Sequence, residues 1–178
     1  MEINAILLPI LRMVRNALER ALRKGWAIDP LRDIKKMKKL VGGMTQVDYV
    51  TLCQTVFGEA RGESRLGRIG IVHAVLNRVE KKSWYGKSVK AVCLKDQQFS
   101  CWLKDDPNSA KAKGMSWYNA NDLLIYRDVN QALSWWADGI DITKGATHYH
   151  TTSVHPFWSK GKDPITQIGV HKYYKNID

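Results

Sequence analysis

Two glutamates four positions apart are the clearest candidates for acid–base chemistry in this sequence. They lie in the segment FGEARGES, residues 57–64, between glycines at a predicted helix end. Glu59 follows an apolar turn, so we expect its carboxyl group to be partly desolvated, which favours the protonated form that a general acid needs. Glu63 lies just before the next predicted helix, where the helix dipole favours an ionised carboxylate. The same spacing is also common at solvated helix ends, with Arg61 as an ion-pair partner.

A second cluster of polar and aromatic residues, QQFSCW, occupies positions 97–102. Amides, a hydroxyl group and aromatic rings close together suit a carbohydrate groove, because sugars stack on aromatic faces and hydrogen-bond to amides. A loop that packs Phe99 and Trp102 into the core would have the same composition, so this cluster alone leaves both interpretations open.

Four histidines, grouped late in the chain, could bind zinc if three of them converged. They are His148, His150, His155 and His171. The HExxH pattern is absent, and no Cys or Asp lies at a ligand-like spacing. Phosphate-binding, dinucleotide-binding and nucleophile-elbow glycine motifs are absent too. We therefore expect hydrogen-bonded histidines that line a cleft, with no metal and no cofactor.

The elements that must position these residues are mostly helices. Thr45 and Asp48 form a predicted capping box at the start of a helix that runs to Ala60. Glycines at positions 67 and 70 of the following helix predict close backbone contact with a neighbour. Alternating polar and aromatic residues later in the chain predict short strands. The expected elements are helices at 45–60, 64–81, 88–94 and 121–138, a polar loop at 95–116, and strands at 146–152 and 169–174.

The net charge of +11 is concentrated at the N-terminus, since ten of the 28 basic and four of the 17 acidic residues fall in residues 1–43. Residues 3–24 read as a basic amphipathic helix, which can bind an anionic membrane or envelope surface, dock on the rest of the chain or pair with a partner. We predict a domain boundary at the Gly42-Gly43 linker, which separates this arm (1–43) from a catalytic domain (44–178). Nucleic acid is not an expected partner, because no recognisable binding module accompanies the charge.

Cysteine content and hydropathy limit the remaining possibilities. Three cysteines without a CxxC pair argue against a disulfide framework, and the pairing of Cys93 with Cys101 stays open. We expect no membrane span and no cleavable signal peptide.

Taken together, several blocks resemble the SleB-type cell-wall hydrolase family, which includes spore-cortex-lytic enzymes and related phage lysin domains. The blocks are TVFGEARGE at 55–63, NR at 77–78, QFS at 98–100, GATHY at 145–149, Trp158 and GVHKY at 169–173. They cover about residues 45–174 in the family's order. Gly58 and His73 depart from the expected small residues, which we expect to affect packing rather than chemistry.

The resemblance implies an α+β, predominantly α, lysozyme-like domain with a small late antiparallel sheet, acting on the glycan strands of peptidoglycan. It implies that Glu59 is the catalytic acid, with Glu63 as a second carboxylate or a structural group. Substrate contacts are expected at Gln98, Ser100, Tyr149, Trp158 and His171. A lytic transglycosylase is favoured over a muramidase; a zinc amidase or peptidase and a non-catalytic wall-binding virion protein are the alternatives. We expect action in the periplasm or cell wall, as in a phage endolysin made in the host cytoplasm.

Overall fold

The structure, a computed structural model, describes residues 43–116 and 119–177 of the 178-residue chain. The predicted basic helix at 3–24 and nearly all of the predicted arm lie outside the described residues, so the arm and the boundary after it stay predictions. The elements are α3 (Gln46–Ala60), α4 (Arg65–Lys81), α5 (Val89–Cys93), η1 (Ser100–Trp102), α6 (Pro107–Lys113), α7 (Ala120–Ala137), β1 (His148–Thr151), η2 (Phe157–Ser159), β2 (Thr166–Ile168) and β3 (His171–Tyr174).

Helix α3 begins at the predicted capping box. The Thr45 hydroxyl accepts a hydrogen bond from the Asp48 N–H at 3.1 Å, and the Asp48 carboxylate accepts one from the Thr45 N–H at 3.0 Å. The same carboxylate accepts the Lys90 N–H at 2.7 Å, which ties the start of α5 to the start of α3. The helix ends at Ala60, so Glu59 lies in its last turn, as predicted.

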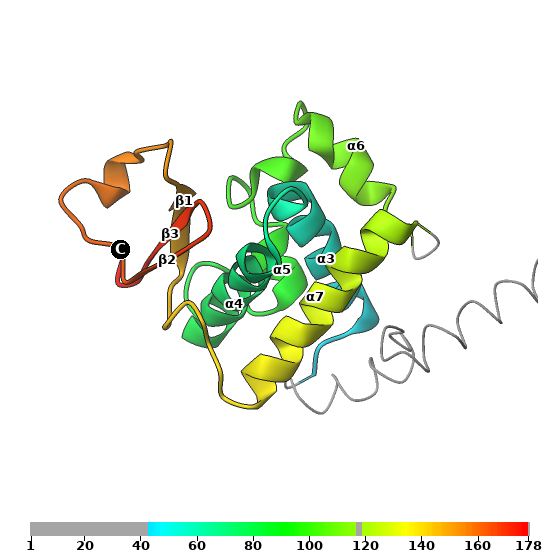
Figure 1. The fold of residues 1–178 in the computed structure, drawn as a ribbon, viewed down its shortest axis with the longest axis horizontal. Coiled ribbons are helices and arrows are strands. Elements are labelled where there is room, and N and C mark those ends of the chain that lie inside the picture. Colours follow the sequence, from blue (N-terminus) through cyan, green and yellow to red (C-terminus); the bar gives the residue numbers. More distant parts are fainter. Residues whose placement is uncertain (1–42, 117–118, 178) are drawn as a thin grey trace, which may run out of the picture. The chain divides into compact units, whose positions relative to one another are not determined.

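Helix α4 is the centre of the helical part, and it packs against α3, α5 and α7 (Figure 1). Ser64 caps its start by accepting the Gly67 N–H at 3.2 Å. His73 is fully buried in it, with Nε2 3.0 Å from the Ala132 carbonyl of α7 and Nδ1 3.1 Å from the Ile142 N–H. The carbonyl can only accept, so His73 carries its proton on Nε2 and links α4 to α7. Its role is therefore in packing, as expected.

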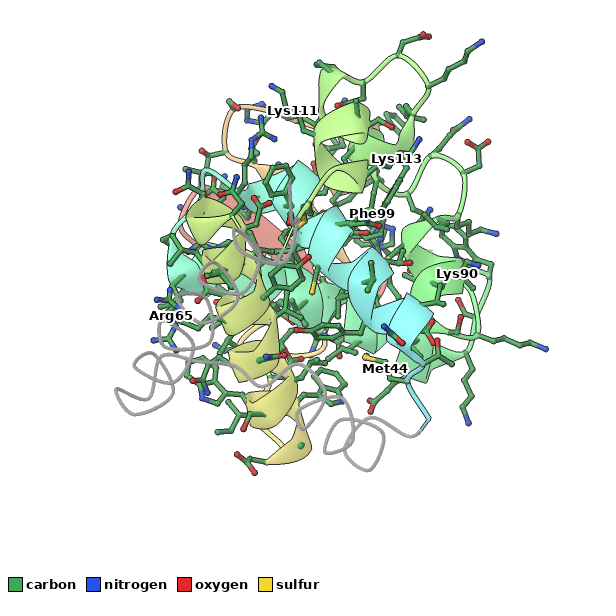
Figure 2. The ribbon with its side chains drawn as sticks, turned by 90° about the vertical axis from the view of Figure 1, so that its right-hand side faces the viewer. Met44, Arg65, Lys90, Phe99, Lys111 and Lys113 are labelled. Carbon is green, nitrogen blue, oxygen red and sulfur yellow. The ribbon has the colours of Figure 1, made fainter. Side chains whose placement is uncertain are left out.

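The prediction of a polar loop over 95–116 was wrong in part. This stretch contains η1 and the short helix α6, whose exposed Lys111 and Lys113 are shown in Figure 2. Asp106 caps α6 by accepting the Asn108 N–H at 2.7 Å, and Pro107 occupies the first turn. The Asp-Pro start signal was not interpreted as a helix, because the residues around it are polar and show no apolar period.

The three strands form an antiparallel sheet of order β1-β3-β2. The two predicted strands are confirmed in shorter form, while β2, a polar strand of three residues, was not predicted. Tyr173 of β3 points at α4: a Cβ added to Gly70 would lie 2.3 Å from its hydroxyl oxygen. Glycine at position 70 therefore allows the helix and the sheet to meet, which confirms the predicted close contact there.

The cysteines are buried thiols, and none of the three is in a disulfide. The open question of a Cys93–Cys101 bridge is therefore answered in the negative. Burial raises the pKa of Cys93 to about 12, so this thiol stays protonated at neutral pH. Within the described part of the chain, no helix combines the length and the apolar character needed to cross a membrane.

Candidate active site

The Glu59 carboxylate is held at the start of η1. Its Oε1 accepts hydrogen bonds from the Cys101 N–H at 3.0 Å and from the Ser100 hydroxyl at 3.3 Å. Glu59 is half-buried, and no backbone N–H or hydroxyl group of a described residue donates to Oε2, while the Cys101 thiol also interacts with the carboxylate. The two donors on Oε1 make Oε2 the oxygen that is free to exchange a proton with a ligand. One oxygen is thus fixed in place while the other can deliver a proton.

Gly58 allows η1 to approach Glu59 so closely. A Cβ at this position would lie 2.3 Å from the Cys101 Cβ and 2.7 Å from its Sγ, far inside van der Waals contact. The departure from the family pattern at Gly58 therefore affects packing, as expected. This packing also places the Cys101 N–H, which donates to Glu59.

Across from Glu59 lies the helix-facing side of the sheet. Register pairs Tyr149 with Tyr173 and Thr151 with His171, which places these four side chains on one face. The Tyr149 and His171 rings meet edge-on at 5.3 Å. Burial lowers the pKa of His171, and the charges of Glu63 and Glu59 oppose that shift. Burial and the Glu59 charge raise the pKa of Tyr149 well above its ordinary value. The fold thus brings Glu59 and Glu63 close to Tyr149 and His171.

Glu63 faces the β2–β3 turn. Its Oε2 lies 3.4 Å from where a Cβ of Gly169 would be, and Gly169 has a left-handed φ of +58°. The backbone carbonyl of Glu63 accepts a hydrogen bond from the Arg68 guanidinium. Arg61 instead stacks over the Phe57 ring, 5.4 Å from its centroid. Glu63 therefore connects the α3–α4 turn to the sheet, and Arg61 contacts an aromatic ring.

The predicted substrate contacts do not all lie together. Ser100 is exposed and donates its hydroxyl to the Glu59 carboxylate at 3.3 Å. Gln98 is half-buried just before η1. Trp158 packs against His148, His150 and Tyr174, with ring centroids 5.1–5.5 Å apart. His150 and Tyr174 lie on the sheet face opposite Tyr149, so Trp158 is not grouped with Glu59 and Tyr149.

Arg78 is a buried arginine near Glu59. The sequence identified it only as part of the family pattern, without a role of its own. The Nε of Arg78 donates to the Thr147 carbonyl at 2.6 Å, and the guanidinium stacks over Phe99 at 5.0 Å and over Tyr85 at 5.5 Å. Burial lowers its pKa, and the Glu59 charge is among the groups that oppose this shift. Arg78 is thus a fixed positive charge near Glu59 that also packs Phe99, the residue before η1.

His148 makes the stability of this region depend on pH. Burial, with the charges of Arg78, Lys81 and Lys162, lowers its pKa from 6.5 to about 4. Because the unfolded chain then binds a proton more readily, stability is lost as pH falls from 6.5 towards 4. We expect this loss to reach about 1–3 kcal/mol and His148→Gln to remove it, measured by thermal unfolding between pH 7 and 4.5. The exposed His155→Gln is the control, and an unchanged pH dependence in His148→Gln would contradict the assignment.

Comparisons of the sequence and of the fold with known proteins point to the same family. A family model described as Cell Wall Hydrolase matches residues 62–174. The spore cortex-lytic enzyme of Halalkalibacterium halodurans is 28% identical over 146 residues, which cover 82% of this chain and 40% of that protein. That of Bacillus subtilis is 30% identical over 132 residues, which cover 73% and 38%. The chain thus spans less than half the length of these curated relatives.

The fold has a solved counterpart in the crystal structure of the catalytic domain of the Bacillus cereus SleB protein. The two superpose with a TM-score of 0.55 at 26% identity, over 75% of this chain and 93% of that domain. Glu59 lies three residues before the range matched by the family model, so its role is argued from geometry. The matched range covers more than half of the chain, and the mostly helical fold with its small antiparallel sheet agrees with that of the SleB catalytic domain. The chain therefore belongs to the SleB-type Cell Wall Hydrolase family.

Proposed function

We propose that the protein is a glycosidase that cleaves the bond between MurNAc and GlcNAc in peptidoglycan, with Glu59 as the general acid. The observation that carries this proposal is the state of the Glu59 carboxylate. One oxygen is anchored by the Cys101 N–H and the Ser100 hydroxyl, the other has no backbone N–H or hydroxyl donor among the described residues, and Tyr149 and His171 are close enough for the Glu59 charge to shift their pKa values. Membership of the cell-wall hydrolase family supports the choice of substrate.

In the proposed first step, Oε2 of Glu59 gives its proton to the bridging oxygen of the glycosidic bond. The C–O bond breaks, its electron pair stays with the leaving oxygen, and the sugar passes through an oxocarbenium-like transition state. In the second step the C6 hydroxyl of the same MurNAc attacks the anomeric carbon and returns its proton to Glu59. The product is a 1,6-anhydro ring, and one carboxylate is sufficient.

The position of Glu63 favours this transglycosylase route over hydrolysis. An inverting or retaining hydrolase uses a second carboxylate on the other face of the sugar. Glu63 lies in the turn that directly follows α3, and its carboxylate points towards Gly169 in the β2–β3 turn. The charges of both carboxylates oppose the lowering of the His171 pKa, so the two glutamates lie near the same histidine. A muramidase that uses Glu63 is the second candidate.

The test is mass spectrometry of the muropeptides released from purified peptidoglycan. We expect products that end in 1,6-anhydro-MurNAc, because no water enters the proposed reaction. Reducing-end products, heavier by one water, would contradict the transglycosylase route and support the muramidase.

Two proposals from other classes give different outcomes in the same digest. A zinc amidase or peptidase would release free peptides and lose activity with a strong chelator. The histidines do not favour it: His148 and His150 lie on one face of the sheet and His171 on the other, and no group of three metal-ligating residues converges in residues 43–116 and 119–177. A non-catalytic wall-binding protein would bind the glycan and release nothing.

We also propose that the protein acts in the periplasm or cell wall, as a phage endolysin or in bacterial wall lysis. The basic residues of segment 3–24 would then contact an anionic envelope surface. Sedimentation of the full chain with anionic vesicles, but not with neutral ones, is the expected result; equal partition between the two would contradict it.

A further inference from the structure

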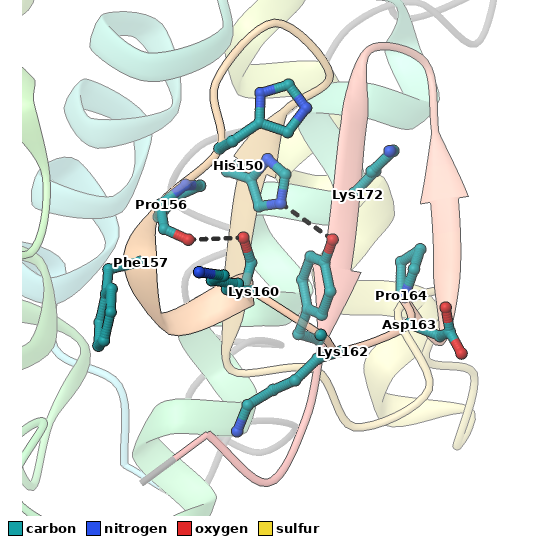
Figure 3. A pocket seen from close by; sticks show the side chains of 12 residues that line it. His150, Pro156, Phe157, Lys160, Lys162, Asp163, Pro164 and Lys172 are labelled. Atoms are coloured by element: carbon teal, nitrogen blue, oxygen red, sulfur yellow. Dashed lines mark hydrogen bonds between the residues drawn. The ribbon is translucent and has the colours of Figure 1, made fainter.

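A pocket lies on the sheet face that does not carry Tyr149 and His171. Residues 152–165, which connect β1 to β2, fold over β1 and β3 and enclose a pocket of about 590 Å³ (Figure 3). This volume is within the range of small-ligand sites. We call it the lysine pocket, because Lys160 and Lys162 of the connection and Lys172 of β3 line it. Its position shows that it is separate from the Glu59 site.

The charge of the lysine pocket is not balanced from within. Asp163 is the one carboxylate in its lining, and none of the three lysines forms an ion pair within the described residues. Three lysines against one carboxylate give the lining a net positive charge, which attracts anions. The lysines also offer donors for charge-assisted hydrogen bonds to carboxylate oxygens.

The floor of the pocket is formed by two stacked and hydrogen-bonded rings. The rings of His150 and Tyr174 stack at 5.2 Å, and the Nε2 of His150 lies 2.9 Å from the Tyr174 hydroxyl. The Nδ1 of His150 is 2.8 Å from the Thr151 carbonyl, which can only accept. Nδ1 therefore carries a proton, and Nε2 shares a hydrogen bond with the Tyr174 hydroxyl.

Two polar side chains of the lining are paired internally. Ser159 donates its hydroxyl to the Pro156 carbonyl at 2.8 Å, and the Tyr174 hydroxyl lies 2.9 Å from Nε2 of His150 (Figure 3). The lysine ammonium groups and the exposed ring of His155 are left for a ligand, while Pro156 and Pro164 add apolar surface. This lining fits a chain with carboxylates and short aliphatic parts better than a neutral sugar.

We infer that the lysine pocket binds a carboxylate-bearing peptide, the class of peptide attached to the glycan of peptidoglycan. The choice of this peptide rests on the proposed function. The sheet then presents two sites, with glycan chemistry at Glu59 on one side and peptide recognition by Lys160, Lys162 and Lys172 on the other.

Titration calorimetry on the full chain tests this inference with a synthetic alanyl-γ-glutamyl-lysine peptide. The double variant Lys160→Gln/Lys172→Gln is expected to raise its Kd at least about tenfold. The matched control is Lys111→Gln/Lys113→Gln, which removes the same charge from exposed positions on α6 and is expected to change Kd less than about twofold. The same peptide with its carboxylates amidated is expected not to bind.

Equal weakening in the two double variants would overturn the inference, because the effect would then come from net charge alone. Equal binding of the amidated peptide would overturn it too. Inorganic phosphate that competes as strongly as the peptide would make the pocket a general anion site and not a peptide site.

The test of peptide binding can fail independently of the test of glycan cleavage. Glu59→Gln is expected to bind the peptide with unchanged Kd, since Glu59 is not part of the lysine pocket. Glycan cleavage without peptide binding would overturn only the lysine pocket. Peptide binding without glycan cleavage would overturn only the proposed reaction.

Discussion

Glu59→Gln is expected to reduce peptidoglycan cleavage by about 10²–10⁴-fold while the fold stays intact. The amide has nearly the same shape as the carboxyl group, and its oxygen can still accept hydrogen bonds from Cys101 and Ser100. It carries no acidic proton for the glycosidic oxygen, so only the chemical step is lost. Turbidity loss of purified walls measures the rate, and circular dichroism confirms folding.

Two isosteric controls make this prediction specific. Glu80→Gln changes an exposed glutamate of α4 and is expected to leave activity unchanged. Glu63→Gln is expected mainly to lower stability, because Glu63 connects the α3–α4 turn to the sheet at Gly169. Near-normal activity in Glu59→Gln would refute the assignment of the acid. Complete loss of activity in a well-folded Glu63→Gln would instead indicate a hydrolase with two carboxylates.

Asp128→Asn is expected to lower the free energy of unfolding by about 3–5 kcal/mol. Asp128 is fully buried in α7, and its Oδ2 accepts from Arg68 of α4 at 2.7 and 2.6 Å. Arg65 and Arg127 also contact it, but both are nearly half exposed, so water screens their contribution. The cost arises because the amide leaves the buried Arg68 charge without a counter-ion. Urea unfolding measures it, with the exposed Asp105→Asn as the control.

A double variant separates this explanation from simple loss of packing. Arg68→Met together with Asp128→Leu removes both charges and keeps the volume, so it is expected to be more stable than Asp128→Asn alone. If the double variant is the less stable of the two, the uncompensated charge is not the cause. Arg68 also donates to the Glu63 carbonyl, so either variant is expected to loosen the turn that holds Glu63.

Local physical chemistry was sufficient to predict much of the helical scaffold. A capping box is a contact between residues three positions apart, and an apolar period is a property of one segment, so Thr45, Asp48 and the bounds of α3 and α4 follow from the sequence. The same signals place Glu59 at the end of α3 and Ser64 at the start of α4. The polar helix α6 and the three-residue strand β2 carry too little of either signal and were not predicted, whereas the short helix α5 was predicted at 88–94.

The arrangement of the candidate site was decided by tertiary structure alone. The hydrogen bond from Cys101 to Glu59 joins residues 42 positions apart, and no local propensity encodes it. Strand register sets which side chains share a face, because a shift of one residue reverses every side chain. That register separates Trp158 from Tyr149, although both belong to the same family pattern. The sequence by itself determined the family, the helices α3, α4, α5 and α7, and the candidate acid. The long-range contacts of Gly58, Cys101 and β3 decided what surrounds that residue.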